Sequence, residues 1–241
     1  MKKYLLLFIL LLLIASGALA QSFKESITLV SRDKATGEKR WESKVDGQYL
    51  VYKGKTYIYF IEEGKDAKPG GLSWRSSAYS NVNGGEVSPY SVDVVMKNDR
   101  GEVVNKISKY YDAEKGKVIC QVNGQVKEFP YQPNMFDKQN MAIILMSFPF
   151  GQKNEIRGSL VTHDPAVYAV RIVHRGEEKV GDIPCYKMEM IFDLGVFNLF
   201  YSFIPKFYFW CETAPPHGFV RYEGLESGLG TPYVVIEGKR D

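Results

Sequence analysis

The side chains best suited to chemistry are three histidines and a set of scattered carboxylates. His163 and Asp164 are neighbours at the end of an apolar run, just before Pro165. This pair resembles a catalytic His–Asp dyad in sequence. Neighbouring residues on a strand point to opposite faces, however, and no serine lies in a G-x-S-x-G turn. We therefore expect no catalytic role for His163.

The remaining polar residues show no metal or phosphate motif. His174 lies in a strand-like run, His217 follows two prolines, and neither an H-E-x-x-H spacing nor a phosphate-binding glycine loop is present. A pair of carboxylates can hydrolyse a glycoside when the fold brings them together. The candidates are Glu62, Glu63, Glu177, Glu178, Glu189, Glu212, Glu223 and Glu226. Because most of them stand in turns or on polar faces, we expect no enzyme, no metal and no cofactor.

Three cysteines allow at most one internal disulfide. The runs 184–194 and 205–212 are consecutive, and a hairpin centred near Asn198 would oppose positions that sum to 396. Cys185 would then face Cys211, at a separation that a disulfide can bridge after slight adjustment. This geometry predicts a Cys185–Cys211 disulfide and leaves Cys120 as an unpaired, buried thiol.

The same register defines a candidate binding face. It places Tyr186 opposite Trp210 and Met188 opposite Tyr208, with Met190 next along the strand. We expect these five side chains to share one apolar surface. An apolar, aromatic face on a curved sheet can enclose a ligand, or it can simply fill a core.

The first twenty residues have the three parts of a secretory signal. Lys2 and Lys3 precede an apolar run over 4–14, and Ala18-Leu19-Ala20 fits the rule for signal peptidase. Eleven apolar residues are too few for a membrane-spanning helix, which needs roughly 20. The residue after the expected cut is Gln21, whereas a lipoprotein would need a cysteine there. We expect a periplasmic protein without a lipid anchor, with residues 1–20 as signal and 21–241 as a single domain.

Net charge argues against a nucleic-acid partner. The chain has 31 basic and 28 acidic residues, and loss of Lys2 and Lys3 leaves 29 basic residues. A dedicated nucleic-acid binder would carry a strong basic excess. The balance gives no reason to prefer anionic membranes or acidic substrates. No second segment is long and apolar enough to span a membrane.

The rest of the chain predicts a mainly β protein. Short β-branched and aromatic runs alternate with turn residues, as in an antiparallel meander, and Asn123-Gly124 is a strong hairpin signal. The polar, glycine-rich stretch 64–85 is expected to be a long loop or mobile flap. The expected strands are 26–30, 39–45, 48–52, 56–61, 91–97, 102–111, 117–122, 125–129, 157–162, 166–174, 184–194, 205–212, 218–222 and 233–237.

One segment predicts a helix. Met141, Ile144, Leu145 and Phe148 fall at helical spacing, Asp137 is a suitable N-cap, and Pro149 ends the pattern. We expect this helix over 137–148 to pack its apolar face on the sheet.

The second half of the chain resembles a known group of proteins. The similarity covers roughly 90–237 and lies in three motifs: Phe148-Pro149-Phe150-Gly151, the run 180–188 that contains Pro184-Cys185-Tyr186, and Tyr208-Phe209-Trp210 followed by Phe219-Val220-Arg221-Tyr222-Glu223. This pattern is similar to uncharacterised bacterial exported envelope proteins that resemble the outer-membrane lipoprotein carrier fold. The resemblance implies an unclosed β half-barrel around a helix, with an apolar concave face. It assigns no catalytic residues.

Three functions follow from these observations. The first is an envelope protein that binds a lipid or acyl chain on the concave face through Tyr186, Met188, Met190, Tyr208 and Trp210. The second is a structural or interaction protein of the envelope, with a filled core, a protein partner and no small ligand. The third and least favoured is a carboxylate-dependent hydrolase.

Overall fold

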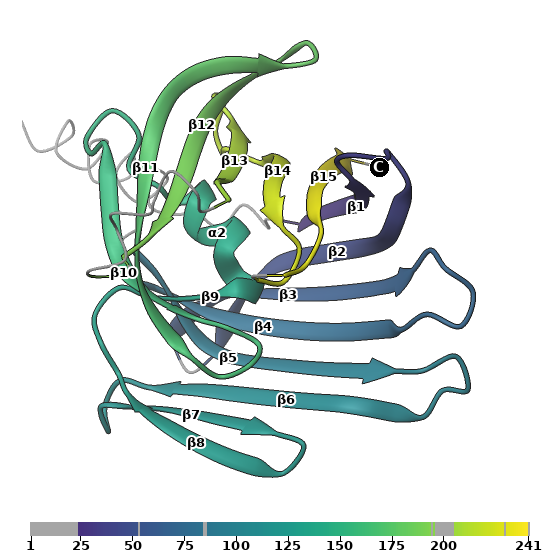
Figure 1. Cartoon of the computed structure of the whole chain (residues 1–241). Helices are drawn as coiled ribbons and strands as arrows, with labels where there is room; N and C mark the ends of the chain where they lie inside the picture. The colour runs from purple at the N-terminus through teal and green to yellow at the C-terminus, as the bar shows by residue number, and fades with distance from the viewer. Residues whose placement is uncertain are drawn as a thin grey trace, which may run out of the picture.

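The described strands of the computed structural model belong to one curved sheet. The structure describes residues 24–52, 54–83, 86–193, 195, 205–228 and 230–240. Across these residues fifteen strands follow the order β8-β7-β6-β5-β4-β3-β2-β1-β15-β14-β13-β12-β11-β10-β9. The chain therefore starts in the middle of the sheet, winds to the β8 edge, crosses to the β9 edge and winds back to pair β15 with β1 (Figure 1).

The strand bounds are as follows. The first eight are β1 Lys24–Asp33, β2 Lys39–Tyr52, β3 Lys55–Asp66, β4 Ser73–Asn83, β5 Glu86–Lys97, β6 Val103–Asp112, β7 Lys117–Val122 and β8 Gln125–Pro130. The remaining seven are β9 Met135–Asp137, β10 Glu155–Val161, β11 Val167–Val180, β12 Ile183–Phe192, β13 Phe207–Glu212, β14 Phe219–Leu225 and β15 Tyr233–Arg240.

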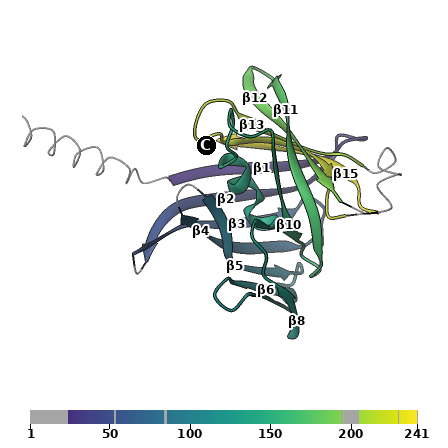
Figure 2. The same cartoon turned by 90° about the vertical axis from the view of Figure 1, so that its left-hand side faces the viewer.

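The prediction of a mainly β, unclosed half-barrel is confirmed, with one refinement of strand direction. Neighbouring strands are antiparallel except β9 and β10, which pair in parallel, so the sheet is mixed. A parallel pair needs a longer connection than a hairpin turn. Here the helical segment after β9 provides that connection, and it lies inside the curve of the sheet (Figures 1 and 2).

The two ends of the sheet meet through side chains. Tyr111, Val118 and Cys120 of β6 and β7 pack against Met135 of β9 and Val161 of β10. These side-chain contacts bring the two ends of the sheet near each other, but no strand ladder joins β8 to β9, so the sheet stays unclosed.

The sharp turns have the predicted chemistry. Asn123 and Gly124 both have positive φ, at 49° and 87°, as the tight hairpin between β7 and β8 requires. At the β5–β6 turn the Asn98 side chain accepts hydrogen bonds from the backbone N–H groups of Arg100 and Glu102, and Gly101 supplies a φ of 79°. Local side-chain bonds of this kind stabilise turns.

The expected loop at 64–85 is wrong: β3 continues to Asp66, and β4 occupies most of the remainder. The inward positions of β4 include Ser76, Ala78 and Ser80, which are small and buried. Alternation between small inward and polar outward residues carries little hydrophobic contrast, so the strand period was hidden in the sequence.

Runs 39–45 and 48–52 form a single strand. Gly47 does not make a turn. Instead its missing side chain makes room for the Phe60 ring, since a Cβ at Gly47 would lie 2.5 Å from that ring.

The helical segment is shorter than expected but is capped as predicted. It consists of a 3-10 turn, η1 (Lys138–Asn140), and the helix α2 (Met141–Met146). The Asp137 carboxylate accepts the N–H of Gln139, and the Asn140 side chain accepts the N–H of Asp137, which completes a reciprocal cap. The predicted apolar face, Met141, Ile144, Leu145 and Phe148, packs against the sheet.

Within the described ranges, no helix has the length and apolar character needed to cross a membrane. The predicted signal at 1–20 lies outside the described residues.

Candidate ligand-binding hollow and polar rim

The predicted register of β12 and β13 is wrong by one residue. Opposed positions sum to 397 rather than 396, so Cys185 faces Glu212 and Met188 faces Phe209. A slip of one residue moves every side chain of a strand to the other face. The run 207–211 is apolar on both faces, so its sequence pattern favours neither register. The residues around the expected turn centre, Asn198, lie outside the described part of the chain.

This register separates the two cysteines. Cys211 lies on the inner face beneath α2, whereas Cys185 packs on the outer face with Trp210 and Val220. The disulfide prediction is therefore wrong, and Cys120, Cys185 and Cys211 are all free and buried. Burial raises the pKa of the Cys211 thiol to about 12 and raises those of the Cys185 and Cys120 thiols as well. Raised values make these thiols poor nucleophiles.

The five predicted ligand-binding residues divide between two faces. Tyr186, Met188 and Met190 point inward toward α2, where the two methionines form part of a closely packed core. Tyr208 and Trp210 point outward, and the Lys187 ammonium lies 4.8 Å from the Tyr208 ring centroid and 5.1 Å from that of Trp210. The predicted residues do not form one surface.

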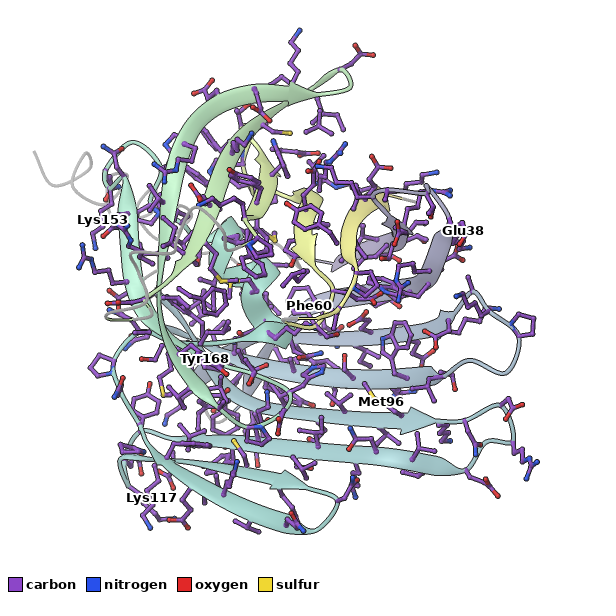
Figure 3. All side chains as sticks on the ribbon, in the orientation of Figure 1. Glu38, Phe60, Met96, Lys117, Lys153 and Tyr168 are labelled. Atoms are coloured by element: carbon purple, nitrogen blue, oxygen red, sulfur yellow. The ribbon has the colours of Figure 1, made fainter. Side chains whose placement is uncertain are left out.

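A hollow lies on the other side of α2. Its volume is about 230 Å³, and it is bounded by the helix, by the inner faces of β2 to β5 and by the loop before β14. Phe60 lies close to α2 in Figure 3 and forms part of the floor. The lining consists of Tyr49, Ile58, Phe60, Val82, Val87, Ile143, Met146, Ser147, Pro216 and His217.

The hollow exists because the two sides of α2 meet different neighbours. Leu145 is fully buried in the core formed with β10 to β14, which we call the C-terminal wall. Ile143 and Met146 instead face strands β2 to β5, the N-terminal wall. Six residues of helix cannot fill the width between both walls, so space remains on one side.

An aromatic cluster that includes Tyr186 borders the hollow. The Phe150 ring stacks on Tyr186 with centroids 4.0 Å apart, and His217 contacts both rings at 4.8 and 5.7 Å. His217 has a φ of 61° and its Nδ1 lies 3.0 Å from the backbone oxygen of Glu212. Tyr186 therefore supports a residue of the lining rather than lining the hollow itself.

Polar residues occupy the inner face of the N-terminal wall beyond the hollow. Glu226, from the loop between β14 and β15, accepts two hydrogen bonds from Arg40 at 2.9 and 2.7 Å and one from the Trp41 indole at 2.9 Å. The hydrogen bonds to Glu226 raise the pKa of the Arg40 guanidinium. A bidentate pair of this kind fixes the orientation of both groups.

Glu62 lies beside this pair and is bound differently. It accepts hydrogen bonds from the Trp74 indole at 3.2 Å and from the Ser76 hydroxyl at 3.4 Å. Trp74 meets Trp41 edge to face, with ring centroids 5.6 Å apart, and its ring lies across Gly64, where a Cβ would be 2.3 Å away. We call Arg40, Trp41, Glu62, Trp74, Glu226 and Lys138 the polar rim.

Lys138 brings a positive charge to the polar rim. Its Nζ donates to the backbone oxygen of Glu226 at 3.1 Å. Surrounding protein lowers the pKa of its ammonium group although part of the side chain still meets solvent, and the charges of Glu62 and Glu226 act in the opposite direction. Lys138 begins the helical segment beside the polar rim, and Met146 ends it beside the apolar hollow. The concave surface along this segment therefore has a polar end and an apolar end.

A buried ion pair anchors the helical segment to the N-terminal half of the sheet. Lys109 of β6 lies 2.8 Å from the Asp137 carboxylate, and both side chains are fully buried. The Tyr111 hydroxyl donates to the same oxygen at 2.5 Å. Burial next to Asp137 raises the pKa of Tyr111 far above its usual range. These groups are closed to a ligand and hold η1 in place.

The His163–Asp164 neighbours do not form a dyad. His163 Nε2 lies 2.6 Å from the side-chain oxygen of Gln139, and burial lowers its pKa to about 3. A histidine that stays neutral at this depth supports η1 rather than exchanging protons at neutral pH. Among the residues described, no group of three or more His, Cys, Asp or Glu could hold a metal ion.

A second hollow lies against the β2–β3 hairpin and is mostly on the outer face. It measures about 290 Å³ and is bounded by Asp46, Gly47, Gln48, Tyr59 and Ile61. Two adjacent strands supply its whole lining, whereas helix, sheet and loop converge on the hollow beneath α2. Convergence of several elements is the usual construction of a ligand site.

Sequence reasoning missed both the hollow and the polar rim. Trp41 and Trp74 are two of the three tryptophans; Trp41 donates to Glu226, 185 positions away, and Trp74 donates to Glu62 of the neighbouring strand. One signal was available: Trp74 lies in the segment 64–85 that was predicted to be a loop, where an aromatic residue has little to pack against. A tryptophan there favours a strand instead. Only strand pairing brings Trp41 and Trp74 together across β3.

Comparison with known proteins identifies the fold and no function. No protein-family model matches the chain, and no curated protein matches it either. A crystal structure of a β-barrel-like protein of a domain of unknown function, DUF1849, from Brucella abortus superposes with a TM-score of 0.53 at 10% identity. The match covers 91% of this chain and 95% of that one. The likeness shows a shared β-barrel-like fold with an uncharacterised protein.

Proposed function

We propose that this protein binds a lipid or other acyl-chain molecule in the hollow between α2 and the N-terminal wall, without catalysis, in the bacterial envelope. The observation that carries the proposal is the hollow itself: a space of about 230 Å³ whose lining is mainly aliphatic and aromatic. Burying the apolar surface of a ligand against such a lining stabilises the complex by about 25 cal/mol per Å².

The size of the hollow limits the ligand. Pockets that enclose drug-sized molecules measure roughly 300–1,000 Å³, so this hollow holds a single alkyl chain or one ring rather than a bulky lipid. The part of the ligand that is not enclosed must lie on the concave surface. The polar rim offers that part a lysine, two indoles and a carboxylate.

An amphiphile fits this arrangement. The eight residue-to-residue steps from Lys138 to Met146 correspond to roughly 12–16 Å along the helical segment. A molecule with an acyl tail in the hollow and a polar head near Lys138 would lie along this segment. Glu226 is already bound by Arg40 and Trp41, so it supports the rim rather than acting as a catalytic acid or base.

Ligand titration of the exported protein tests the proposal. A fluorescent medium-chain fatty acid should bind saturably, and native mass spectrometry with organic extraction should recover an acyl compound from protein purified from its own cells. Met146→Trp fills the hollow and should weaken binding by at least about tenfold, whereas Met146→Leu keeps the volume and should not.

The second candidate is a structural protein of the envelope, and the close-packed C-terminal wall favours it. A clean mass and no saturable binding would reject the ligand proposal in favour of this one. Equal affinities for Met146→Trp and Met146→Leu would place any binding elsewhere on the molecule.

A further inference from the structure

The β2–β3 hairpin presents apolar residues to solvent at its tip. Val51 is 76% exposed, Tyr52 is 62% exposed and Tyr49 is 44% exposed. They lie close together at the end of β2, next to the hairpin turn, and they point to both faces of the hairpin. A cluster of exposed apolar residues on a projecting element marks an interaction surface more often than scattered residues do.

This tip adjoins the mouth of the hollow. Tyr49 belongs both to the tip and to the lining, and Val82 and Val87 bring the β4–β5 hairpin to the same end of the sheet. The polar rim lies toward the opposite end, near the β3–β4 turn, because Trp74 and Glu62 stand at that end of their strands. The apolar part of the concave surface therefore opens beside the exposed tip.

The charge of the hairpin tip is one-sided. Among the described residues 48–52 and 54–57 the sequence contains Lys55 and no acidic residue, although the whole chain is nearly balanced. Tyrosine and lysine are the residues that sit at the boundary between lipid head groups and water. Each lysine near an anionic bilayer strengthens binding by about fivefold.

We propose that the β2–β3 hairpin tip docks on the surface of an anionic lipid bilayer and sets the mouth of the hollow against it. This inference rests on the proposed function. In that orientation an amphiphile leaves the bilayer head first, its polar group moves toward Lys138 and the polar rim, and its tail follows into the hollow.

Vesicle co-sedimentation tests the docking surface. Val51→Glu/Tyr52→Glu places two negative charges at the tip, and both positions are exposed enough to leave the fold intact. The matched control is Val103→Glu/Val104→Glu, a consecutive exposed pair (57% and 46%) at the opposite end of the sheet. All variants share one N-terminus, checked by intact mass, so any contribution from residues 4–14 cancels.

The expected results differ between vesicle types. Binding to vesicles of phosphatidylglycerol and phosphatidylcholine should fall about tenfold or more for the tip variant and stay within about twofold for the control. Both variants add two negative charges, so the difference between them reports where the charges lie. Lys55→Gln should lower binding to these vesicles by about fivefold and leave binding to pure phosphatidylcholine unchanged.

Ligand transfer separates this inference from the proposed function. The tip variant should bind a free fluorescent fatty acid like the unmodified protein but should take it from vesicles at least about tenfold more slowly.

Equal vesicle binding by the tip and control variants would overturn the docking surface and would leave the proposed binding of free ligand unaffected. Vesicle binding without free-ligand binding would overturn the proposed function instead. A tip-dependent dimer in sedimentation velocity, with no vesicle binding, would assign the surface to a second copy of the chain.

Discussion

The two walls of the half-barrel use the same short helical segment in different ways. Against the C-terminal wall, Leu145 and Met188 are fully buried in one continuous core. Against the N-terminal wall, Met146 faces a hollow, and the nearby inner surface carries tryptophans, glutamates and a lysine. One wall therefore stabilises the fold, and the other retains the space and the polar groups that the proposed ligand would occupy.

The buried ion pair between Lys109 and Asp137, which holds the helical segment, should give the largest effect on stability. Lys109→Met leaves the Asp137 carboxylate buried without its cation, which should lower the free energy of unfolding by about 3–5 kcal/mol in a denaturant titration. The double variant Lys109→Met/Asp137→Asn removes both charges and retains a capping side chain, so it should recover part of that loss. No recovery would show that the contribution comes from packing rather than from charge pairing.

Two adjacent helix residues give the sharpest test of the difference between the walls. Leu145→Ala should destabilise the protein by about 2–5 kcal/mol because it opens a cavity in the C-terminal core. Met146→Ala should cost only about 1 kcal/mol because its side chain borders existing space. The two changes have similar helix propensities, so the difference measures packing. Equal losses would show that α2 is packed alike on both sides.

The backbone of the N-terminal wall is fitted to its aromatic residues. A Cβ at Gly64 would lie 2.3 Å from the Trp74 ring, so Gly64→Ala should displace the indole and cost about 1–3 kcal/mol. The displaced Trp74 would lose its bond to Glu62, and tryptophan fluorescence should shift. Gly37→Ala is a useful contrast, because nothing surrounds that glycine and its φ of 73° is the only source of strain. A shift in fluorescence for Gly37→Ala as well would point to a general loosening of the fold.

Local sequence signals predicted local structure well. The Asp137 cap, the helical stripe and the Asn123-Gly124 turn each depend on a few neighbouring residues, and all three are present. These signals could not set the β12–β13 register, because 207–211 is apolar on both faces and therefore fits either pairing. They also missed β4, whose buried positions are small rather than apolar.

The candidate site was harder to predict than the fold. The large apolar residues of β12 and β13 were predicted to form a binding face because they alternate with other residues along the strands. Met188 and Met190 instead lie in a filled core, and Trp210 lies on the outer side. The hollow depends on where α2 leaves space, and the polar rim depends on pairing between residues such as Arg40 and Glu226, which are 186 positions apart. No local pattern encodes either feature.

The contribution of His163, which supports η1, is the smallest of these effects at neutral pH and grows as the pH falls. Burial lowers the pKa of His163 to about 3, whereas in the unfolded chain it titrates near its usual value of 6.5. Between these two pH values the unfolded state binds a proton that the folded state does not, so acidification should lower the free energy of unfolding. His163→Gln removes this proton and keeps a side chain that can bond Gln139, so its stability should fall less steeply between pH 6.5 and pH 4. Equal slopes for the variant and the unmodified protein would show that His163 titrates alike in the folded and unfolded chains, which would contradict its burial against η1.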